Sequence, residues 1–189
     1  MAIRETKPFD ITGIEKVMLQ FADNTDVIQC VGNISGTTEM RTLTRTCKGV
    51  STSIAKPQKL KVTATMYMPI ETARDLYGLE NKELKKGVYS YNASSKGKAF
   101  SFVARFKDDF SETEKMIAIP KSRTTSGLNF TADSEATDIA KITLEFEAEL
   151  DELNNLYYEA LIDEKDGITE QEAKKWEEKF TTDLVKAAA

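Results

Sequence analysis

Several segments of this chain alternate apolar and polar residues with a period of two, which is the pattern of a β-strand with one buried face. The longest such segment, residues 141–150, has Ile142, Leu144, Phe146, Ala148 and Leu150 on one face and Lys141, Thr143, Glu145, Glu147 and Glu149 on the other. A one-residue shift of register would bury three carboxylates, so the pattern specifies which face meets the core. Residues 60–68 and 100–106 alternate in the same way. The sequence therefore predicts a mainly β fold.

Two helices are expected beside the strands. Pro69 and Gly78 bracket a short amphipathic helix, because proline is tolerated in a helix's first turn and glycine commonly follows its last. Thr169 and Glu172 match a capping box that begins a second helix, which we expect to continue to about residue 186. Its candidate packing stripe consists of Ala173, Trp176, Phe180 and Leu184. This stripe packs either onto the chain's own sheet or onto an adjacent copy.

Composition argues against catalysis. The 189 residues include no His, so the chain lacks the commonest general base and the commonest metal ligand. Cys30 and Cys47 are the only cysteines, too few for a four-cysteine zinc site; reduced thiols are favoured, with a single disulfide as the alternative. The chain is expected not to be an enzyme, with no cofactor, no metal and no membrane partner, since no run approaches the ~20 apolar residues of a membrane span.

Charge is distributed unevenly along the chain. Residues 1–130 contain 20 Lys and Arg against 14 Asp and Glu, whereas residues 131–189 contain 6 against 17. The simplest interpretation is a solvated acidic face. The alternative is head-to-tail self-association, in which the acidic end of one copy meets the basic end of the next.

The least regular part of the sequence is residues 32–57, predicted as a long loop. It is rich in threonine and carries Arg41, Arg45, Lys48 and Lys56, which are candidate inter-subunit residues. A long hairpin that becomes ordered against a neighbouring copy is the alternative, because the segment has β-propensity and positive charge. Residues 1–163, beginning with an N-terminal arm over residues 1–12, are expected to form one β domain, and residues 164–189 a helical extension.

The order of motifs between residues 69 and 163 resembles that of the major tail proteins of long-tailed, non-contractile bacteriophages, the subunits of the tail tube. The motifs are ARDLYGLE (73–80), ELKKGVYSY (83–91), SSKGKAFSF (94–102), IPKSRTTSGLNF (119–130) and KITLEFEAELDE (141–152). The resemblance implies an antiparallel β-sandwich or barrel with a short flanking helix. It also implies self-assembly into stacked, hexameric rings that form the conduit for genome delivery.

Further expectations follow from this resemblance. The partners would be other copies, the tape-measure protein, tail-tip and terminator proteins, and double-stranded DNA passing through the lumen without specific binding. The protein would lie in the virion tail after assembly in the host cytoplasm. Glu145, Glu147 and Glu149 are candidate lumen-facing residues, because a negative lining repels phosphate; an outer surface is the competing assignment. A contractile or bacteriocin tail stays open, and the alternative function is a monomeric β-sandwich module that binds carbohydrate or protein.

Overall fold

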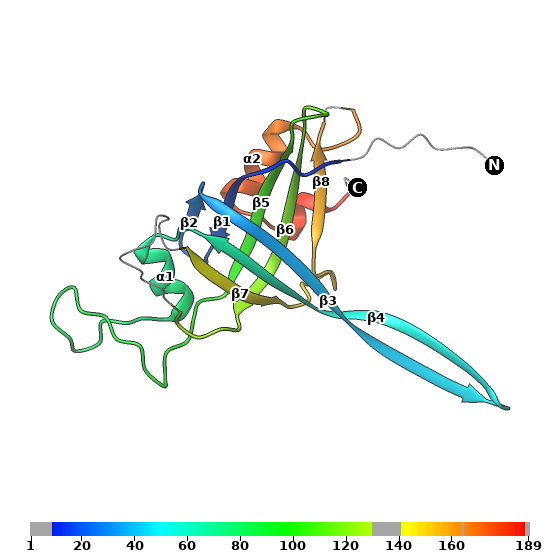
Figure 1. Ribbon diagram of the computed structural model, residues 1–189, viewed down its shortest axis with the longest axis horizontal. Coiled ribbons are helices and arrows are strands. Elements are labelled where there is room, and N and C mark those ends of the chain that lie inside the picture. The colour runs from blue at the N-terminus through cyan, green and yellow to red at the C-terminus, as the bar shows by residue number, and fades with distance from the viewer. Residues whose placement is uncertain (1–8, 130–140, 164, 188–189) are drawn as a thin grey trace.

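The computed structural model describes residues 9–129, 141–163 and 165–187 (Figure 1). Most of the N-terminal arm predicted at residues 1–12 lies outside the described residues. In chain order the elements are β1 (Gly13–Gln20), β2 (Thr25–Ile28), β3 (Val31–Cys47), β4 (Val50–Met66), α1 (Ile70–Tyr77), β5 (Phe100–Asp108), β6 (Thr113–Thr124), β7 (Ile142–Ala148), β8 (Tyr158–Ile162), α2 (Glu170–Glu178) and the 3₁₀ helix η1 (Thr182–Val185).

The described strands form one eight-stranded antiparallel sheet with the order β2-β1-β5-β6-β7-β4-β3, and β8 pairs with β6 outside this path. The sheet branches at β6, which pairs with β8 through residues 114–118 and with β7 through residues 122–124. Pro120 lies between these two stretches, where the missing N–H of proline leaves no ladder bond unmade. The prediction of a mainly β, antiparallel fold with short helices is confirmed.

Branching produces two layers, because the β3–β4–β7 branch crosses over the β1–β5–β6 branch (Figure 1). The main core fills the space between them and includes Val17, Leu19, Phe102, Phe106, Ile119, Leu144 and Phe146. The Phe146 ring lies 4.9 Å from that of Phe102 and 5.3 Å from that of Phe100, in tilted and edge-on geometries that aromatic pairs favour. The apolar faces of β4 and β7 therefore lie inside the fold. Leu150, expected on the same face, follows the end of β7 and is exposed.

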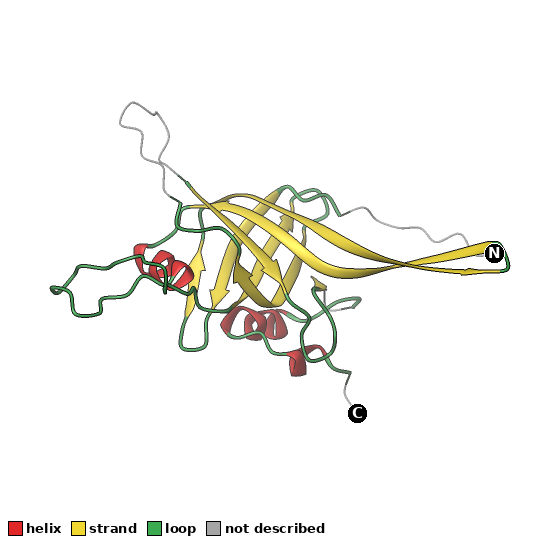
Figure 2. Ribbon diagram, turned by 90° about the horizontal axis from the view of Figure 1, so that it is seen from below, coloured by secondary structure: helices red, strands yellow, loops and turns green. Residues whose placement is uncertain are grey.

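A second core lies on the opposite face of the β1–β5–β6 branch, under α2 (Figure 2). Met18, Val103, Met116 and Ala118 of the strands contact Ala173, Trp176 and Phe180 of the C-terminal segment. Strand β5 is consequently buried on both faces, which explains why its sequence is apolar at neighbouring positions. The C-terminal segment expected as an extension thus packs onto the sheet of its own chain.

The first helix ends at Gly78, which has a left-handed backbone with φ of 67°. A Cβ atom at this position would lie 2.3 Å from the Lys96 carbonyl oxygen, so only glycine fits without displacing backbone. The loop that follows contains a single described bridge, between Glu80 and Ser90.

The structure corrects the prediction of a long loop at residues 32–57. Those residues form most of two paired strands, β3 and β4, in continuous antiparallel register from Val31–Met66 to Cys47–Val50 with two irregularities. Threonine favours extended backbone. The inner part of β4 pairs with β7, and the β3–β4 pair continues outward from there.

The structure also corrects the length of the second helix, which ends at Glu178 rather than near residue 186. Gln20 of β1 binds the helix end: its Nε2 donates to the carbonyl oxygens of Trp176 (2.7 Å) and Glu177 (3.0 Å), and its Oε1 accepts from the Phe180 N–H (2.7 Å). These bonds satisfy backbone groups that a helix terminus otherwise leaves without partners. Leu184 consequently lies in η1 and is 36% exposed, so it is not part of the packing stripe.

Candidate assembly surfaces

The most exposed feature of the molecule is the outer part of the β3–β4 hairpin, residues 40–57, which we call the hairpin arm. It projects away from the two layers (Figures 1 and 2), and each of its residues is exposed. Eight residues of strand, at ~3.3 Å each, carry its tip roughly 25 Å beyond the body of the fold. Large apolar side chains lie exposed on it, including Val50 at 68%. A protrusion of this kind is typical of an interaction element.

The hairpin arm has two chemically different faces, because directly paired residues of β3 and β4 share a face. The cationic face consists of Arg41, Leu43, Arg45, Cys47, Val50, Thr52, Ile54 and Lys56. The hydroxyl face consists of Met40, Thr42, Thr44, Thr46, Ser51, Ser53, Ala55 and Pro57, with hydroxyl pairs Thr44–Ser53 (2.8 Å) and Thr46–Ser51 (2.9 Å). Three of the four predicted inter-subunit residues therefore share one face, and Lys48 occupies the turn.

Arg41 and Lys56 lie directly opposite each other, although like charges in that position destabilise a strand pair. Within the described part of the chain, neither forms an ion pair with a carboxylate. Both cations are therefore available to an anionic partner outside the chain.

Cys30 directly precedes β3 and Cys47 is its last residue, and both cysteines are free and exposed. The strand's 17 residues separate them by roughly 50 Å, whereas a disulfide requires Cα atoms within about 7 Å. The alternative of a disulfide between Cys30 and Cys47 of one chain is therefore wrong.

Of the candidate lumen-facing residues, Glu145 and Glu147 lie on the face of β7 that points away from the core, and Glu149 directly follows β7 and is exposed. This face is not purely acidic. Glu147 pairs with Lys59 at 2.7 Å and lies 3.8 Å from Lys61, while Glu149 lies 3.6 Å from Lys121. The neighbouring strands thus place cations beside the carboxylates, and the lumen assignment stays a prediction.

A groove of about 750 Å³ opens at the root of the hairpin arm. Its lining is largely apolar and includes Ile34, Leu60, Phe106, Ile117, Leu150 and Tyr157. One wall belongs to residues 149–161, which we call the acidic segment because it contains four carboxylates and no basic residue. Leu150, Leu153 and Tyr157 of this segment are exposed apolar side chains. The groove therefore joins an uncovered apolar surface to a margin that is only partly neutralised. Glu159 pairs with Lys115 of the groove lining and Glu149 lies 3.6 Å from Lys121, whereas Asp151 and Glu152 form no ion pair with a described residue.

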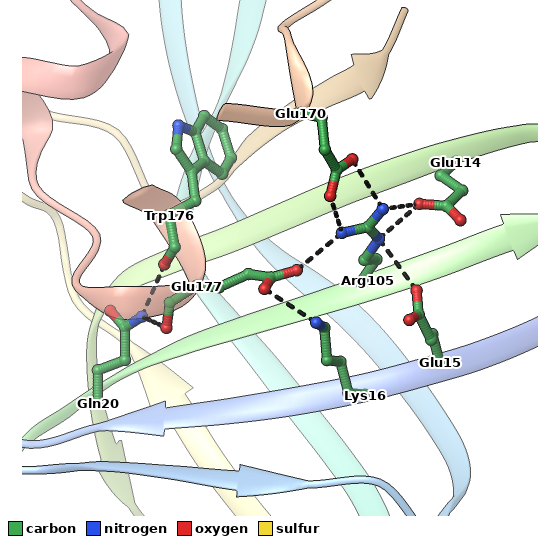
Figure 3. Close-up of polar contacts among 8 residues, drawn as sticks. All are labelled: Glu15, Lys16, Gln20, Arg105, Glu114, Glu170, Trp176 and Glu177. Atoms are coloured by element: carbon green, nitrogen blue, oxygen red, sulfur yellow. Dashed lines mark hydrogen bonds and ion pairs between the residues drawn. The ribbon is translucent and has the colours of Figure 1, made fainter. Parts of the chain in front are cut away.

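The predicted packing stripe is held in place by a charged cluster that sequence analysis did not identify (Figure 3). Arg105 of β5 is only 8% exposed. Its guanidinium binds Glu170 through two parallel bonds of 3.0 Å and contacts Glu177 (2.9 Å), Glu15 (3.0 Å) and Glu114. Lys16 contacts the other oxygen of Glu177 at 2.9 Å. The cluster ties both ends of α2 to the sheet.

Burial disfavours the charged form of Arg105, but the hydrogen bonds that its guanidinium donates to Glu170, Glu177 and Glu114 outweigh that effect, so the pKa of the guanidinium is raised. The same hydrogen bond lowers the pKa of Glu170. Both groups are therefore charged across the neutral range, and the cluster acts as a permanent ionic contact.

Gln20 and Arg105 were missed because each is a single polar residue within a strand. The available signal was continuous apolar sequence at Val17–Met18–Leu19 and Phe102–Val103–Ala104, which is typical of strands buried on both faces. A polar residue in such a strand must find a partner, since an unpaired buried polar group is costly.

In the described ranges, no group of three or more His, Cys, Asp or Glu residues is arranged to hold a metal ion. No helix in that part of the chain is both long and apolar enough to span a membrane.

The sequence matches no protein-family model, and no curated protein matches it. Its fold is similar to a solved structure described as the anti-feeding prophage cap, a tube-terminating cap determined by cryo-electron microscopy. The TM-score is 0.50 at 10% sequence identity, and the similarity covers 86% of this chain and 97% of the cap chain. At that identity the similarity concerns the fold.

Proposed function

We propose that this protein is a structural subunit of the tube of a phage tail or phage-tail-like particle, which assembles with other copies of itself. The observation that carries the proposal is the similarity of fold to a tube-terminating cap over 86% of this chain. The motif order between residues 69 and 163, which resembles that of major tail proteins, supports the same class independently. The role is structural and involves no catalytic turnover.

In the finer form of this proposal, copies form hexameric rings that stack into a tube in the virion tail. The tape-measure protein and tail-tip or terminator proteins are the other partners, and DNA passes through the lumen. Glu145, Glu147 and Glu149 then face the lumen, where their neighbouring cations reduce the net charge of the lining. A head-to-tail contact that closes gives the ring, and one that does not close gives the stack.

A second candidate is a terminating cap, because the similar solved structure is itself a tube-terminating cap. A cap forms single rings and binds the ends of tubes made by other subunits. The two roles differ in one property: a tube subunit stacks on itself, whereas a cap does not.

Negative-stain electron microscopy of the purified full-length protein, with light scattering across concentration, separates these candidates. Stacked tubes with a central hole are expected for the tube subunit, and isolated rings for the cap. In a second variant, a short turn replaces residues 40–57. The hairpin arm lies outside both cores, so this variant should fold and keep the emission of the buried Trp176. A strict monomer at the highest concentration would refute both roles and favour the binding module.

A further inference from the structure

We propose that the hairpin arm of one copy binds the groove and acidic segment of a second copy of this chain. This inference rests on the proposed self-assembly and names the two surfaces that meet. The cationic face lies toward the partner, with Leu43 and Ile54 over the apolar groove and Arg41 and Arg45 over the carboxylates of the acidic segment.

Charge supports this pairing. The hairpin arm carries four basic residues and no acidic one, and the acidic segment carries four acidic residues and no basic one. Two of the four carboxylates, Glu149 and Glu159, lie beside lysines of their own chain, and the other two do not. The facing cations Arg41 and Lys56 repel each other in the single chain, and that repulsion is relieved when an anion lies between them. On the acidic segment, Glu152 is exposed and forms no ion pair with any described residue.

Exposed apolar surface also supports the pairing of the hairpin arm with the groove. Leu43 and Ile54 form a cross-strand pair that is 41% and 51% exposed, directly next to the Arg41–Lys56 pair. The groove presents exposed Leu150 and Tyr157 on its wall. The hydroxyl face offers no comparable match, since its eight residues carry no charge and are mostly threonine and serine.

Geometry excludes docking of the hairpin arm into the groove of its own chain. The groove lies at the root of the hairpin arm, where Lys56 and Pro57 line it, and the arm runs away from that root (Figure 1). Its register is continuous from Met40–Pro57 to Cys47–Val50, so it does not fold back onto its own groove. Because donor and acceptor surfaces differ, the contact is heterologous, and each copy can give one arm and receive another.

A single contact of this kind is small. A two-stranded ribbon about 25 Å long and 10 Å wide covers a few hundred Å², below the ~800 Å² per partner of a stable binary complex. This contact is therefore too small to hold two copies together by itself, and it is stable only in combination with further contacts between copies. We expect assembly to be cooperative and steeply dependent on concentration.

Cysteine cross-linking tests the contact directly. Cys30 and Cys47 are first replaced by serine, and Leu43→Cys and Leu150→Cys are made in separate preparations, one with a size tag. The mixture, treated with a short bis-maleimide under assembly conditions, should give a covalent dimer containing one chain of each. Thr44→Cys is the matched control: it neighbours Leu43 but lies on the hydroxyl face, so it should give several-fold less product with Leu150→Cys.

Charge reversal gives a second, independent test. Arg41→Glu with Lys56→Glu, or Glu149→Lys with Glu152→Lys, should each raise the concentration needed for assembly by roughly tenfold or more, because like charges then face each other. Mixing the two variants should restore assembly, because copies of the two variants can alternate so that every hairpin arm meets an acidic segment of opposite charge. These residues lie outside both cores, so the Trp176 emission checks that each variant is folded.

The outcomes separate this inference from the proposed function. Rings or tubes that form without the Leu43–Leu150 product and tolerate both charge reversals would refute the docking of hairpin and groove while leaving the tube role intact. A protein that never self-associates would refute both. Equal cross-linking from Leu43→Cys and Thr44→Cys would refute the assignment of the cationic face.

Discussion

Replacing Gln20 with leucine should detach the end of α2 from the sheet. The amide of Gln20 is 4% exposed and makes three hydrogen bonds to the backbone where the helix stops. Leucine has a similar size and is apolar, so the substitution removes the hydrogen bonds with little change in volume. What remains is the cost of leaving backbone groups buried without partners.

The expected magnitude follows from how buried each bond is. The bonds to the Trp176 carbonyl and from the Phe180 N–H are buried, whereas the bond to the Glu177 carbonyl is partly buried, so water can replace it. Each buried group left unsatisfied costs about 1–3 kcal/mol, and burying the leucine side chain recovers about 1 kcal/mol. The free energy of unfolding should therefore fall by about 2–4 kcal/mol, which corresponds to a decrease in Tm of roughly 5–15 °C for a chain of this length.

Urea unfolding followed by tryptophan fluorescence measures this effect at the right place. Trp176 is the chain's single tryptophan, is 2% exposed and lies in the last turn of the helix. Thr25→Val is the matched control, because the Thr25 hydroxyl donates to the Glu178 carbonyl (2.9 Å) in an exposed bond that water can replace. The control should lose less than about 1 kcal/mol. A Gln20→Leu loss below about 0.5 kcal/mol would refute the assignment of Gln20 as the cap.

Three further predictions concern the attachment of α2. Arg105→Leu should lower the free energy of unfolding by about 1–3 kcal/mol, less than for a fully buried ion pair because the Glu170 side chain is 50% exposed; an unchanged urea midpoint would contradict this. The pKa of Glu170 lies below its ordinary value of 4.5, so the contribution of this carboxylate to stability is present above pH 4.5 and is lost as the pH falls through the lowered pKa. Glu170→Gln should therefore reduce the loss of stability at acid pH, measured from unfolding curves that follow the Trp176 emission. Thr169→Ala should cost about 1 kcal/mol in urea unfolding by removing the capping box, whereas Thr169→Ser should cost little.

Local patterns predicted the elements that depend on local chemistry. The alternation at residues 60–68 and 141–150 identified β4 and β7, whose apolar faces contribute to the main core, although Leu150 beyond β7 is exposed. Gly78 ends α1 and Thr169 begins α2 as predicted, since both signals act within one turn of helix. These features follow from backbone conformation and side-chain periodicity, which a short segment carries in its own sequence.

The hairpin arm shows where local pattern was insufficient. Its threonines and its charges fit either a loop or a strand pair, and the choice depends on β7 holding the root of β4. Register then decided which residues share a face. Because of that register, Arg41, Arg45 and Lys56 gather beside Leu43 and Ile54, although in sequence they appear only as scattered basic residues.

The sequence by itself determined that the chain is mainly β, where its helices begin, and that it lacks the histidines on which common catalytic and metal sites depend. The tertiary structure alone decided where α2 ends, that β5 is buried on both faces, and that a groove lies beside an acidic segment. The reason is physical: helix starts and strand faces depend on neighbours within a few residues. By contrast, the bonds of Gln20 and Arg105 and the lining of the groove join residues far apart in the chain, and such pairings exist only once the layers have packed.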